Sequence, residues 1–337
     1  MIRQLIFILT LTLFAAEYSV AQSDFDLSQR HLNESVYNPA ATGNTFYTNI
    51  YAHARVQWAG LPGAPYTEAI GFSTYLDDYN SAAALFISGD QIGFTHTYNA
   101  RLSYAFYIPV FKRSAISLGL SGALLYRSQN ATNALVDDLT DSELFHGNIS
   151  ETRPDFDFGV ELNGPLKMGI AFRHFAPKLA SANFKPYSSH IWSYISTTQN
   201  FGSSTTAIEP VVSHVLRDRF NRFEAGAFLH FKRELLRYNS YSKIKIYSDS
   251  KYWFGGMWRL HGQFSVMAGI ALNENRNLKI GYSFDYAAGE LARLSQFGTH
   301  EIFISWKMKP LRKCDSGCPG AENKELMDRV SGRFVIY

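Results

Sequence analysis

The stretch that most constrains the fold of this chain runs from residue 251 to residue 286, where apolar and polar side chains alternate. Alternation with a period of two is typical of a β-strand whose two faces have different surroundings. Short polar joints at 260–262 and 273–276 divide the stretch into three runs, which we expect to be consecutive antiparallel strands. Their apolar faces consist of Phe254, Trp258 and Leu260; Phe264, Val266, Ala268, Ile270 and Leu272; and Leu278, Ile280, Tyr282, Phe284 and Tyr286.

The same alternation recurs through most of the chain and predicts 14 strands in total. Joints that are polar or rich in Gly and Pro separate the strands. An even number of antiparallel strands is characteristic of single-chain bacterial transmembrane barrels. Besides the three strands above, the predicted strands span 45–60, 66–76, 80–89, 95–109, 112–127, 154–162, 166–175, 190–201, 208–217, 220–231 and 298–309.

A β-sandwich is the alternative fold, because its strands also alternate between turns. Aromatic residues make up 15% of the chain and charged residues only 18%. A long aromatic face shared by many strands, with no strand buried on both sides, favours a barrel whose rings form girdles at the two membrane interfaces. The predicted fold class is therefore all-β, an antiparallel transmembrane barrel of about 14 strands in the cell outer membrane.

The N-terminus has the features of an export signal. Arg3 precedes an apolar run at 5–14, and Ser19-Val20-Ala21 supplies the small residues that signal peptidase requires. The apolar run is shorter than the ~20 residues that a membrane-spanning helix needs. We therefore predict a cleaved signal peptide at 1–21.

The rest of the chain divides into three parts by composition. Residues 22–43 are polar and predict a periplasmic N-terminal segment that can tuck into the barrel lumen. Residues 44–309 contain all the predicted strands. Residues 310–337 follow the last strand, and we expect them to form a short C-terminal extension in the periplasm.

Loop lengths agree with this orientation in all but one place. With both termini in the periplasm, the long loops at 128–153 and 176–189 lie outside, and the tight turns at 77–79 and 163–165 lie inside. Transmembrane barrels have this asymmetry of short periplasmic turns and longer external loops. The exception is 232–250, which is long and falls on the periplasmic side, so either the strand register slips there or an insertion extends into the periplasm.

The strand faces opposite the apolar ones carry charges of both signs. An ion channel usually has a ring of one sign, so a mixed set predicts ion pairs across a largely closed lumen. Charges solvated in a narrow, wet lumen are the alternative. The inward-facing candidates are His53, Arg55, Arg101, Asp155, Asp157, Glu161, Arg173, Arg222, Glu224, Lys279, Asp285 and Glu301.

No motif in the sequence predicts catalysis or a cofactor. The ten His residues are scattered without the H-E-x-x-H spacing of a zinc site, and there is no nucleophile elbow or nucleotide-binding loop. An acidic cluster at 137–143 lacks the spacing of a calcium loop. A net charge of +3 spread along the chain gives no footprint for nucleic acid. We expect a protein that is not an enzyme and that binds no cofactor, metal or nucleic acid.

Cys314 and Cys318 are the two cysteines of the chain. In the oxidising periplasm, two cysteines this close in sequence are expected to form a small local disulfide. Metal binding would need two further ligands, and the neighbouring sequence offers none.

Several motifs resemble the PorP/SprF family of type IX secretion system outer-membrane proteins. They are Y-N-P-A-A-T-G at 37–43, R-V-Q-W-A-G-L-P-G-A-P at 55–65, D-Q-I-G at 90–93, N-R-N-L-K-I-G-Y-S-F-D-Y at 275–286, and G-T-H-E-I at 298–302. The resemblance implies a monomeric barrel that serves protein secretion and, in some members, gliding motility. The insertion at 232–250 and the tail at 310–337 depart from the family pattern.

The function that this resemblance implies is support for the secretion or surface anchoring of large adhesin-type cargo. The implied partners are outer-membrane lipid, other secretion components including periplasmic peptidoglycan-associated proteins, and the secreted adhesin. The alternative is an outer-membrane diffusion channel or transporter for small or hydrophobic solutes.

Overall fold

The computed structural model describes residues 26–45, 47–76, 79–111, 114–130, 148–175, 187–201, 205–217, 220–232, 235–239, 244–247, 250–260, 263–272, 277–287 and 297–308. The predicted signal peptide, the acidic cluster at 137–143, the disulfide between Cys314 and Cys318, and the tail at 310–337 lie outside these residues.

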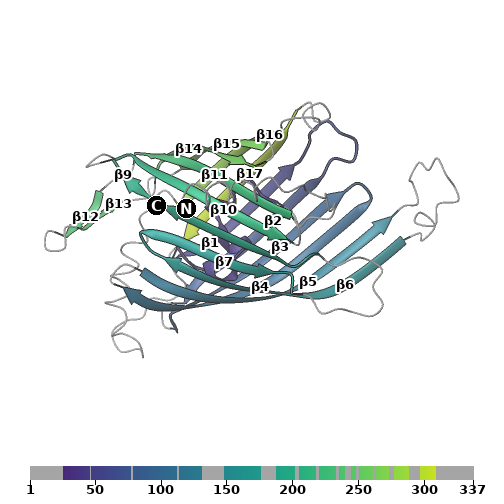
Figure 1. Ribbon diagram of the computed structural model, residues 1–337, viewed down its shortest axis with the longest axis horizontal. Coiled ribbons are helices and arrows are strands. Elements are labelled where there is room, and N and C mark those ends of the chain that lie inside the picture. Colours follow the sequence, from purple (N-terminus) through teal and green to yellow (C-terminus); the bar gives the residue numbers. More distant parts are fainter. Residues whose placement is uncertain are drawn as a thin grey trace, which may run out of the picture.

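The strands form a closed antiparallel barrel, which confirms the predicted fold class (Figure 1). Each barrel strand pairs with the next one along the chain, and the last strand pairs with the first, from Thr48 opposite Met308 to Val56 opposite His300. Within the described part of the chain the barrel has fourteen strands, and the two-residue β9 (Gln199–Asn200) pairs with the start of β10 beside them. The fourteen are β1 (Thr48–Val56), β2 (Tyr66–Leu76), β3 (Ser81–Ile92), β4 (Thr95–Phe111), β5 (Ser114–Asn130), β6 (Asn148–Asn163), β7 (Leu166–Arg173), β8 (His190–Thr197), β10 (Ala207–Arg217), β11 (Phe220–Phe231), β14 (Tyr252–Arg259), β15 (Gln263–Leu272), β16 (Leu278–Ala287) and β17 (Thr299–Met308).

The two ends of the barrel differ. The end at which β1 begins and β17 ends is called the near end here, and the opposite end is the far end. The wall is not equally tall, because β4 and β5 have 17 residues each and β6 has 16, whereas β7 and β8 have 8 each. Figure 1 shows β5 and β6 reaching beyond the other strands at the far end.

The tall part of the wall includes residues that the sequence predicts as loop. Strand β5 continues to Asn130 and β6 begins at Asn148, inside the polar stretch predicted as a loop at 128–153. Polar side chains occupy both faces of these strand ends, so no alternation marks them. The two strands nevertheless stay paired there, with cross-strand neighbours such as Arg127 opposite Glu151.

The insertion at 232–250 does not shift the register of the barrel. Strands β11 and β14 pair without interruption from Glu224 opposite Arg259 to Phe231 opposite Tyr252. Between them, β12 (Leu235–Asn239) and β13 (Ile244–Tyr247) form a separate two-stranded hairpin at the near end (Figure 1). Of the two explanations offered by the sequence, the extended insertion is the one observed.

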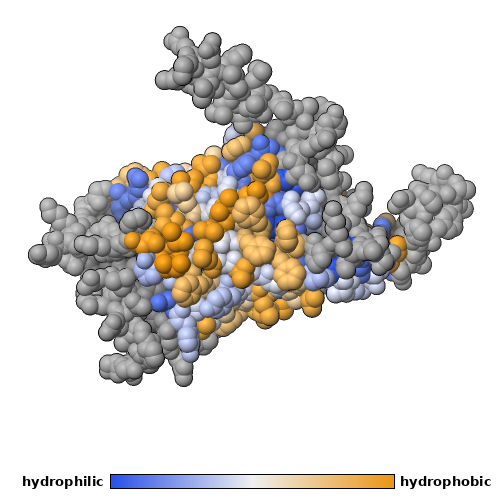
Figure 2. Space-filling view, turned by 60° about the horizontal axis from the view of Figure 1, so that its bottom comes forward, coloured by the Kyte–Doolittle hydropathy of each residue, from blue (hydrophilic) through white to orange (hydrophobic). Residues whose placement is uncertain are grey.

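The outer wall of the barrel is apolar, as the alternation predicts. On β14, Phe254 and Trp258 are about half exposed, whereas the inward-facing Met257 between them is buried. Figure 2 shows the apolar side chains gathered over the wall, with hydrophilic ones towards its rims. Exposed aromatic rings lie near both ends, including Tyr79 and Trp306 at the near end and Phe175 and Phe297 at the far end. These positions match the aromatic girdles of a transmembrane barrel.

In the described residues, no helix is long and apolar enough to cross a membrane.

Candidate functional site

The lumen of the barrel contains the chain segment that precedes β1. Residues 26–45, called the N-terminal plug here, contain three 3-10 turns: η1 (Arg30–Leu32), η2 (Glu34–Val36) and η3 (Pro39–Ala41). Leu27, Ala40 and Thr42 are fully buried by the inward-facing side of the wall. Leu27, Val36 and Tyr37 form one apolar cluster with wall residues that include Tyr51, Phe86, Trp192 and Phe303. The inward face of the wall therefore contacts protein along the length of this segment.

Inward-facing glycines provide the space that the plug occupies. A Cβ atom built on Gly119 of β5 would overlap the backbone of Pro39 and Ala40. One built on Gly159 of β6 would overlap the side chain of Asn38. Any larger residue at these two positions would collide with η3, so the wall is shaped around the plug at this point.

Polar wall side chains satisfy the backbone carbonyl groups of the second half of the plug. Arg101 of β4 donates from Nη1 to the carbonyl oxygen of Val36 at 2.8 Å. Ser117 of β5 donates to that of Ala40 at 2.7 Å, and the Tyr107 hydroxyl of β4 donates to that of Thr42 at 2.6 Å. Buried carbonyl groups need such partners, and β4 and β5 supply them.

The first half of the plug is held by charge. Arg55 of β1 lies 2.9 Å from Asp285 of β16 and 3.3 Å from Glu301 of β17. Glu301 also accepts hydrogen bonds from the backbone N–H groups of Ser28 at 2.6 Å and Gln29 at 3.1 Å. One buried group of charges thus joins the plug to three neighbouring strands, β16, β17 and β1.

A second charged group lies beside the first, around Glu224 of β11. Glu224 is 3.1 Å from Arg30 of the plug and 2.8 Å from Arg259 of β14. Asp26 of the plug is 2.8 Å from Arg30 and 2.9 Å from Arg222 of β11. Burial alone would raise the pKa of Asp26, but the surrounding guanidinium groups hold it well below its ordinary value. Asp26 is therefore a carboxylate, as this group of cations requires.

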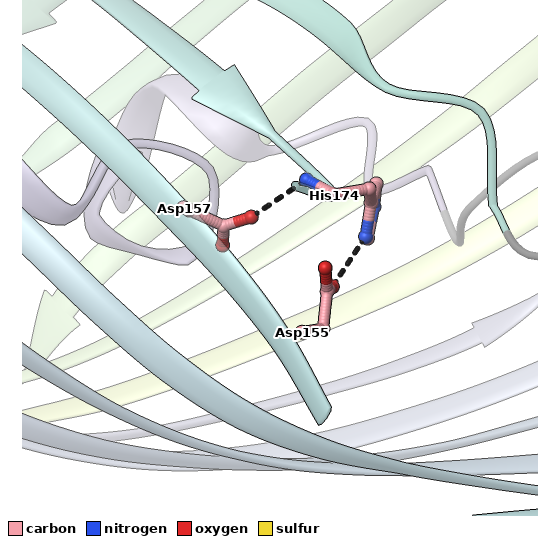
Figure 3. Close-up of side chains that lie close together, drawn as sticks. All are labelled: Asp155, Asp157 and His174. Atoms are coloured by element: carbon pink, nitrogen blue, oxygen red, sulfur yellow. Dashed lines mark hydrogen bonds and ion pairs between the residues drawn. The ribbon is translucent and has the colours of Figure 1, made fainter. Parts of the chain in front are cut away.

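A third charged group lies on β6 and directly after β7, where Asp155, Asp157 and His174 come together (Figure 3). His174 approaches Asp155 through Nδ1 at 2.6 Å and donates its backbone N–H to Asp157 at 3.0 Å. The ligand atoms of the three residues lie within 4.8 Å of one another, which is close enough to hold a metal ion. However, Asp157 is also 3.2 Å from Nε of Arg101 and 3.8 Å from that of Arg173. These guanidinium groups supply the positive charge that a cation would bring, so the arrangement favours an ion-pair network.

Near-end residues of the wall and the middle of the plug line a cavity of about 290 Å³. Lys167 of β7 forms an ion pair with Glu34 of the plug, and Glu209 of β10 lies 3.0 Å from His230 of β11. The lining of the cavity includes these four residues and His31, whose ring stacks on Phe228 with centroids 3.7 Å apart.

His31 is a plug side chain whose two ring nitrogens are shielded from solvent. Neither ring nitrogen has a hydrogen-bond partner in the part of the chain that the structure describes. Burial lowers the pKa of His31 to about 3, with Glu209 acting in the opposite direction and His230 and Lys167 in the same direction. The imidazole is therefore neutral while the plug is in place.

Most of the inward-facing residues named from the sequence fall into these groups. Arg55, Asp285 and Glu301 lie together, as do Arg222 and Glu224, and so do Arg101, Asp157 and Arg173. Asp155 pairs with His174, and Glu161 contacts Tyr194 and Asn44. Lys279 lies apart from them, at the near-end cavity.

The sequence did not identify the plug residues Asp26, Arg30 and Glu34 as partners of the wall. Their segment has no alternation, so nothing indicated which side chains would face which strand. Arg259 also went unnamed, although it stands between the outward-facing Trp258 and Leu260 and its inward direction follows from the alternation.

Residues 19–306 of the chain match a protein family that is described as type IX secretion system membrane protein PorP/SprF. No protein of curated function matches the chain.

Several solved structures of outer-membrane proteins are similar in fold. The Ralstonia pickettii toluene transporter TbuX has 11% identity and a TM-score of 0.48, with 82% of this chain and 92% of that chain covered. The CymD monoaromatic hydrocarbon channel has 11% identity and a TM-score of 0.49, with 86% and 94% covered. The Acinetobacter baumannii protein Omp33 has 9% identity and a TM-score of 0.42, with 78% and 98% covered. Such values are too low to transfer a solute or a partner to this chain.

Proposed function

The chain belongs to the PorP/SprF family of type IX secretion system membrane proteins, and from this premise we propose that it is a non-enzymatic component that supports secretion or surface anchoring of large adhesin-type cargo. It is a β-barrel of the outer membrane, with an apolar wall and a filled interior. In this proposal the barrel is a membrane-anchored platform for other proteins, and its lumen is not their route.

The occupied lumen is the observation that carries the proposal. Solute channels need binding that is weak enough for release along a continuous path. Here the far-end part of the plug is bound by the ion pair of Arg30 with Glu224 and by the hydrogen bond from the Ser28 backbone N–H to Glu301. The near-end part is bound by hydrogen bonds from Tyr107 and Ser117. These contacts support a barrel that stays closed while it contacts its partners through its rims.

The two rims differ in a way that supports a role between two compartments. At the near end β1 begins, β17 ends and the β12–β13 hairpin extends. We assign this end to the periplasm, where the other secretion components lie. The far end carries the tall β4–β6 wall, and we assign it to the cell surface, where an adhesin would be held.

Conductance of the purified protein in planar bilayers tests the closed barrel. We expect no steady conductance from the wild-type chain, with a known open porin in the same bilayer as a positive control. A steady conductance, or swelling of liposomes in small sugars or monoaromatic compounds, would instead favour the solute-channel function.

Cells that lack the protein test the secretion role separately. We expect a large adhesin to disappear from the surface and accumulate in the periplasm, and affinity-tagged protein to retain periplasmic secretion components after membrane solubilisation. Normal surface adhesin together with a defect in solute uptake would contradict the proposal.

A further inference from the structure

Two lysines lie on adjacent strand ends at the near end, where β11 ends and β14 begins. The Nζ atom of Lys232 lies 5.4 Å from the ring centroid of Tyr252, and that of Lys251 lies 5.8 Å from the same centroid. The backbone N–H of Lys251 donates to the carbonyl oxygen of Phe231 at 3.0 Å, so the lysines lie on adjacent strand ends. Two ammonium groups therefore share one aromatic ring.

No carboxylate in the described residues lies within ion-pair distance of either lysine. The arginines of the lumen differ in this respect, since Arg30, Arg55, Arg222 and Arg259 each contact Asp or Glu. Like charges on neighbouring strands are destabilising. The ring of Tyr252 offsets part of this repulsion by cation–π attraction, but it does not neutralise the charge.

The ring that the two lysines share lies on the membrane-facing side of the wall. Trp253 points inward and is buried, whereas Phe254 points outward and is about half exposed, so Tyr252 also points outward. Its cross-strand neighbours Phe231 and Ile270 share that side of the wall. A tyrosine with basic neighbours directly beside an apolar surface is the arrangement found at the level of lipid headgroups.

We propose that Lys232, Lys251 and Tyr252 bind the headgroup of an anionic glycerophospholipid. The phosphodiester would bridge the two ammonium groups, the Tyr252 hydroxyl would donate to a phosphate oxygen, and the acyl chains would lie along Phe231, Phe254 and Ile270. The lipid would come from the inner leaflet of the outer membrane, a location that rests on the periplasmic assignment of the near end in the proposed function.

Native mass spectrometry of the whole purified protein tests the site. Mixed micelles of phosphatidylglycerol and phosphatidylcholine supply the anionic and the zwitterionic lipid at equal concentration. We expect the wild type to retain phosphatidylglycerol selectively. Since each lysine near a lipid surface contributes about 1 kcal/mol, the double variant Lys232→Gln with Lys251→Gln is expected to bind roughly thirtyfold more weakly.

Lys307→Gln is the matched control. Lys307 lies at the same end of the barrel and also stands over a tyrosine, with Nζ 4.6 Å from the Tyr47 ring centroid, but it lines the lumen cavity. Its replacement should leave lipid retention unchanged. A heat-modifiability gel checks that every variant is folded, and Tyr252→Leu provides a second variant that leaves both charges in place and should weaken binding.

Three outcomes would overturn the proposal. They are equal retention of phosphatidylglycerol by wild type and double variant, equal loss in the Lys307→Gln control, and displacement of the lipid by an equal concentration of inorganic phosphate, which would indicate a free-phosphate site. All measurements use purified protein without secretion partners, so failure here is distinct from failure of the secretion role.

Discussion

The two halves of the plug are held in different ways. Residues 26–30 lie among buried charges from β1, β11, β14, β16 and β17. Residues 36–42 lie against β4, β5 and β6, which offer glycines and hydrogen bonds to backbone carbonyl groups, from the Arg101 guanidinium and from the hydroxyl groups of Tyr107 and Ser117. Charge interactions depend on protonation and on having every partner present, whereas the second half depends on shape. The difference teaches that the plug has one end that responds to solution conditions and one end that does not.

The largest effect is expected from removing a central charge, with Arg55→Met. The change leaves Asp285 and Glu301 close together in a buried site without their shared cation, which typically costs about 3–5 kcal/mol. Thermal unfolding in detergent should show a lower midpoint, and hydrogen exchange of residues 26–30 should accelerate more than that of 36–42. Glu68→Gln, at an exposed carboxylate on the outer wall, is the control and should leave both unchanged. Equal acceleration in both halves would contradict the comparison.

The next effect addresses the half that depends on shape, with Gly119→Ala. The added Cβ meets backbone atoms of Pro39 and Ala40, which have no rotamer by which to move away, so we expect a cost of about 1–3 kcal/mol. Hydrogen exchange should increase at 36–42 and stay unchanged at 26–30. Gly122→Ala on the same strand faces outward, where the nearest atom to its Cβ is 3.8 Å away on Phe156, and it serves as the control.

A third effect is expected from pH through His31. Its pKa is lowered to about 3 in place but rises to about 6.5 once the plug is released. The released form therefore binds an extra proton between these values, and plug retention is fully present above pH 6.5. As the pH drops from 6.5 towards 3, the equilibrium constant for holding the plug in the lumen falls by at most about tenfold per pH unit. Asp26, whose pKa is also lowered, adds to the loss below about pH 3.8.

Conductance or hydrogen exchange measured from pH 7.5 to pH 5 checks this prediction. His31→Leu keeps an apolar contact for Phe228 but cannot bind the proton, so its plug retention should fall much less over that range than the retention of the wild-type plug. A wild-type plug that is held equally well at both pH values would show that His31 does not control release.

The smallest effect is expected from Ser117→Ala, which removes one hydrogen bond to the carbonyl oxygen of Ala40. A single neutral hydrogen bond contributes about 0.5–1.5 kcal/mol. We expect a slight increase in hydrogen exchange near Ala41 and no change near Ser28. An effect as large as that of Arg55→Met would show that both halves of the plug are equally sensitive.

The sequence was sufficient to predict the barrel, because the alternation on strands such as β14 to β16 directly reports two different surroundings. It was also sufficient for the inward direction of Arg55, Asp285 and Glu301. It did not reveal where β5 and β6 end, since strand ends with polar residues on both faces carry no periodic signal.

The arrangement of the plug lay beyond sequence reasoning for a different reason. A segment of short 3-10 turns has no fixed period, and its partners are up to 273 residues away in the chain, as for Ser28 and Glu301. Gly119 and Gly159 look like ordinary strand glycines until the segment that they accommodate is known. Only the closed three-dimensional wall shows why those positions lack side chains.

The pairing of β1 with β17 has a consequence for the order of assembly. This pairing joins the first and the last strand of the barrel, so its partners are separated by more residues than those of any other strand pair. Because contacts between distant residues form slowly, we expect this pairing to form last. The plug directly precedes β1, and Ser28 contacts Glu301 of β17 and Asp285 of β16. If the plug already lies against β16 and β17, it holds β1 close to β17. Fewer conformations then have to be sampled before the two strands pair. The segment that fills the finished lumen would then also act during biogenesis, as an internal guide for the last step of barrel closure.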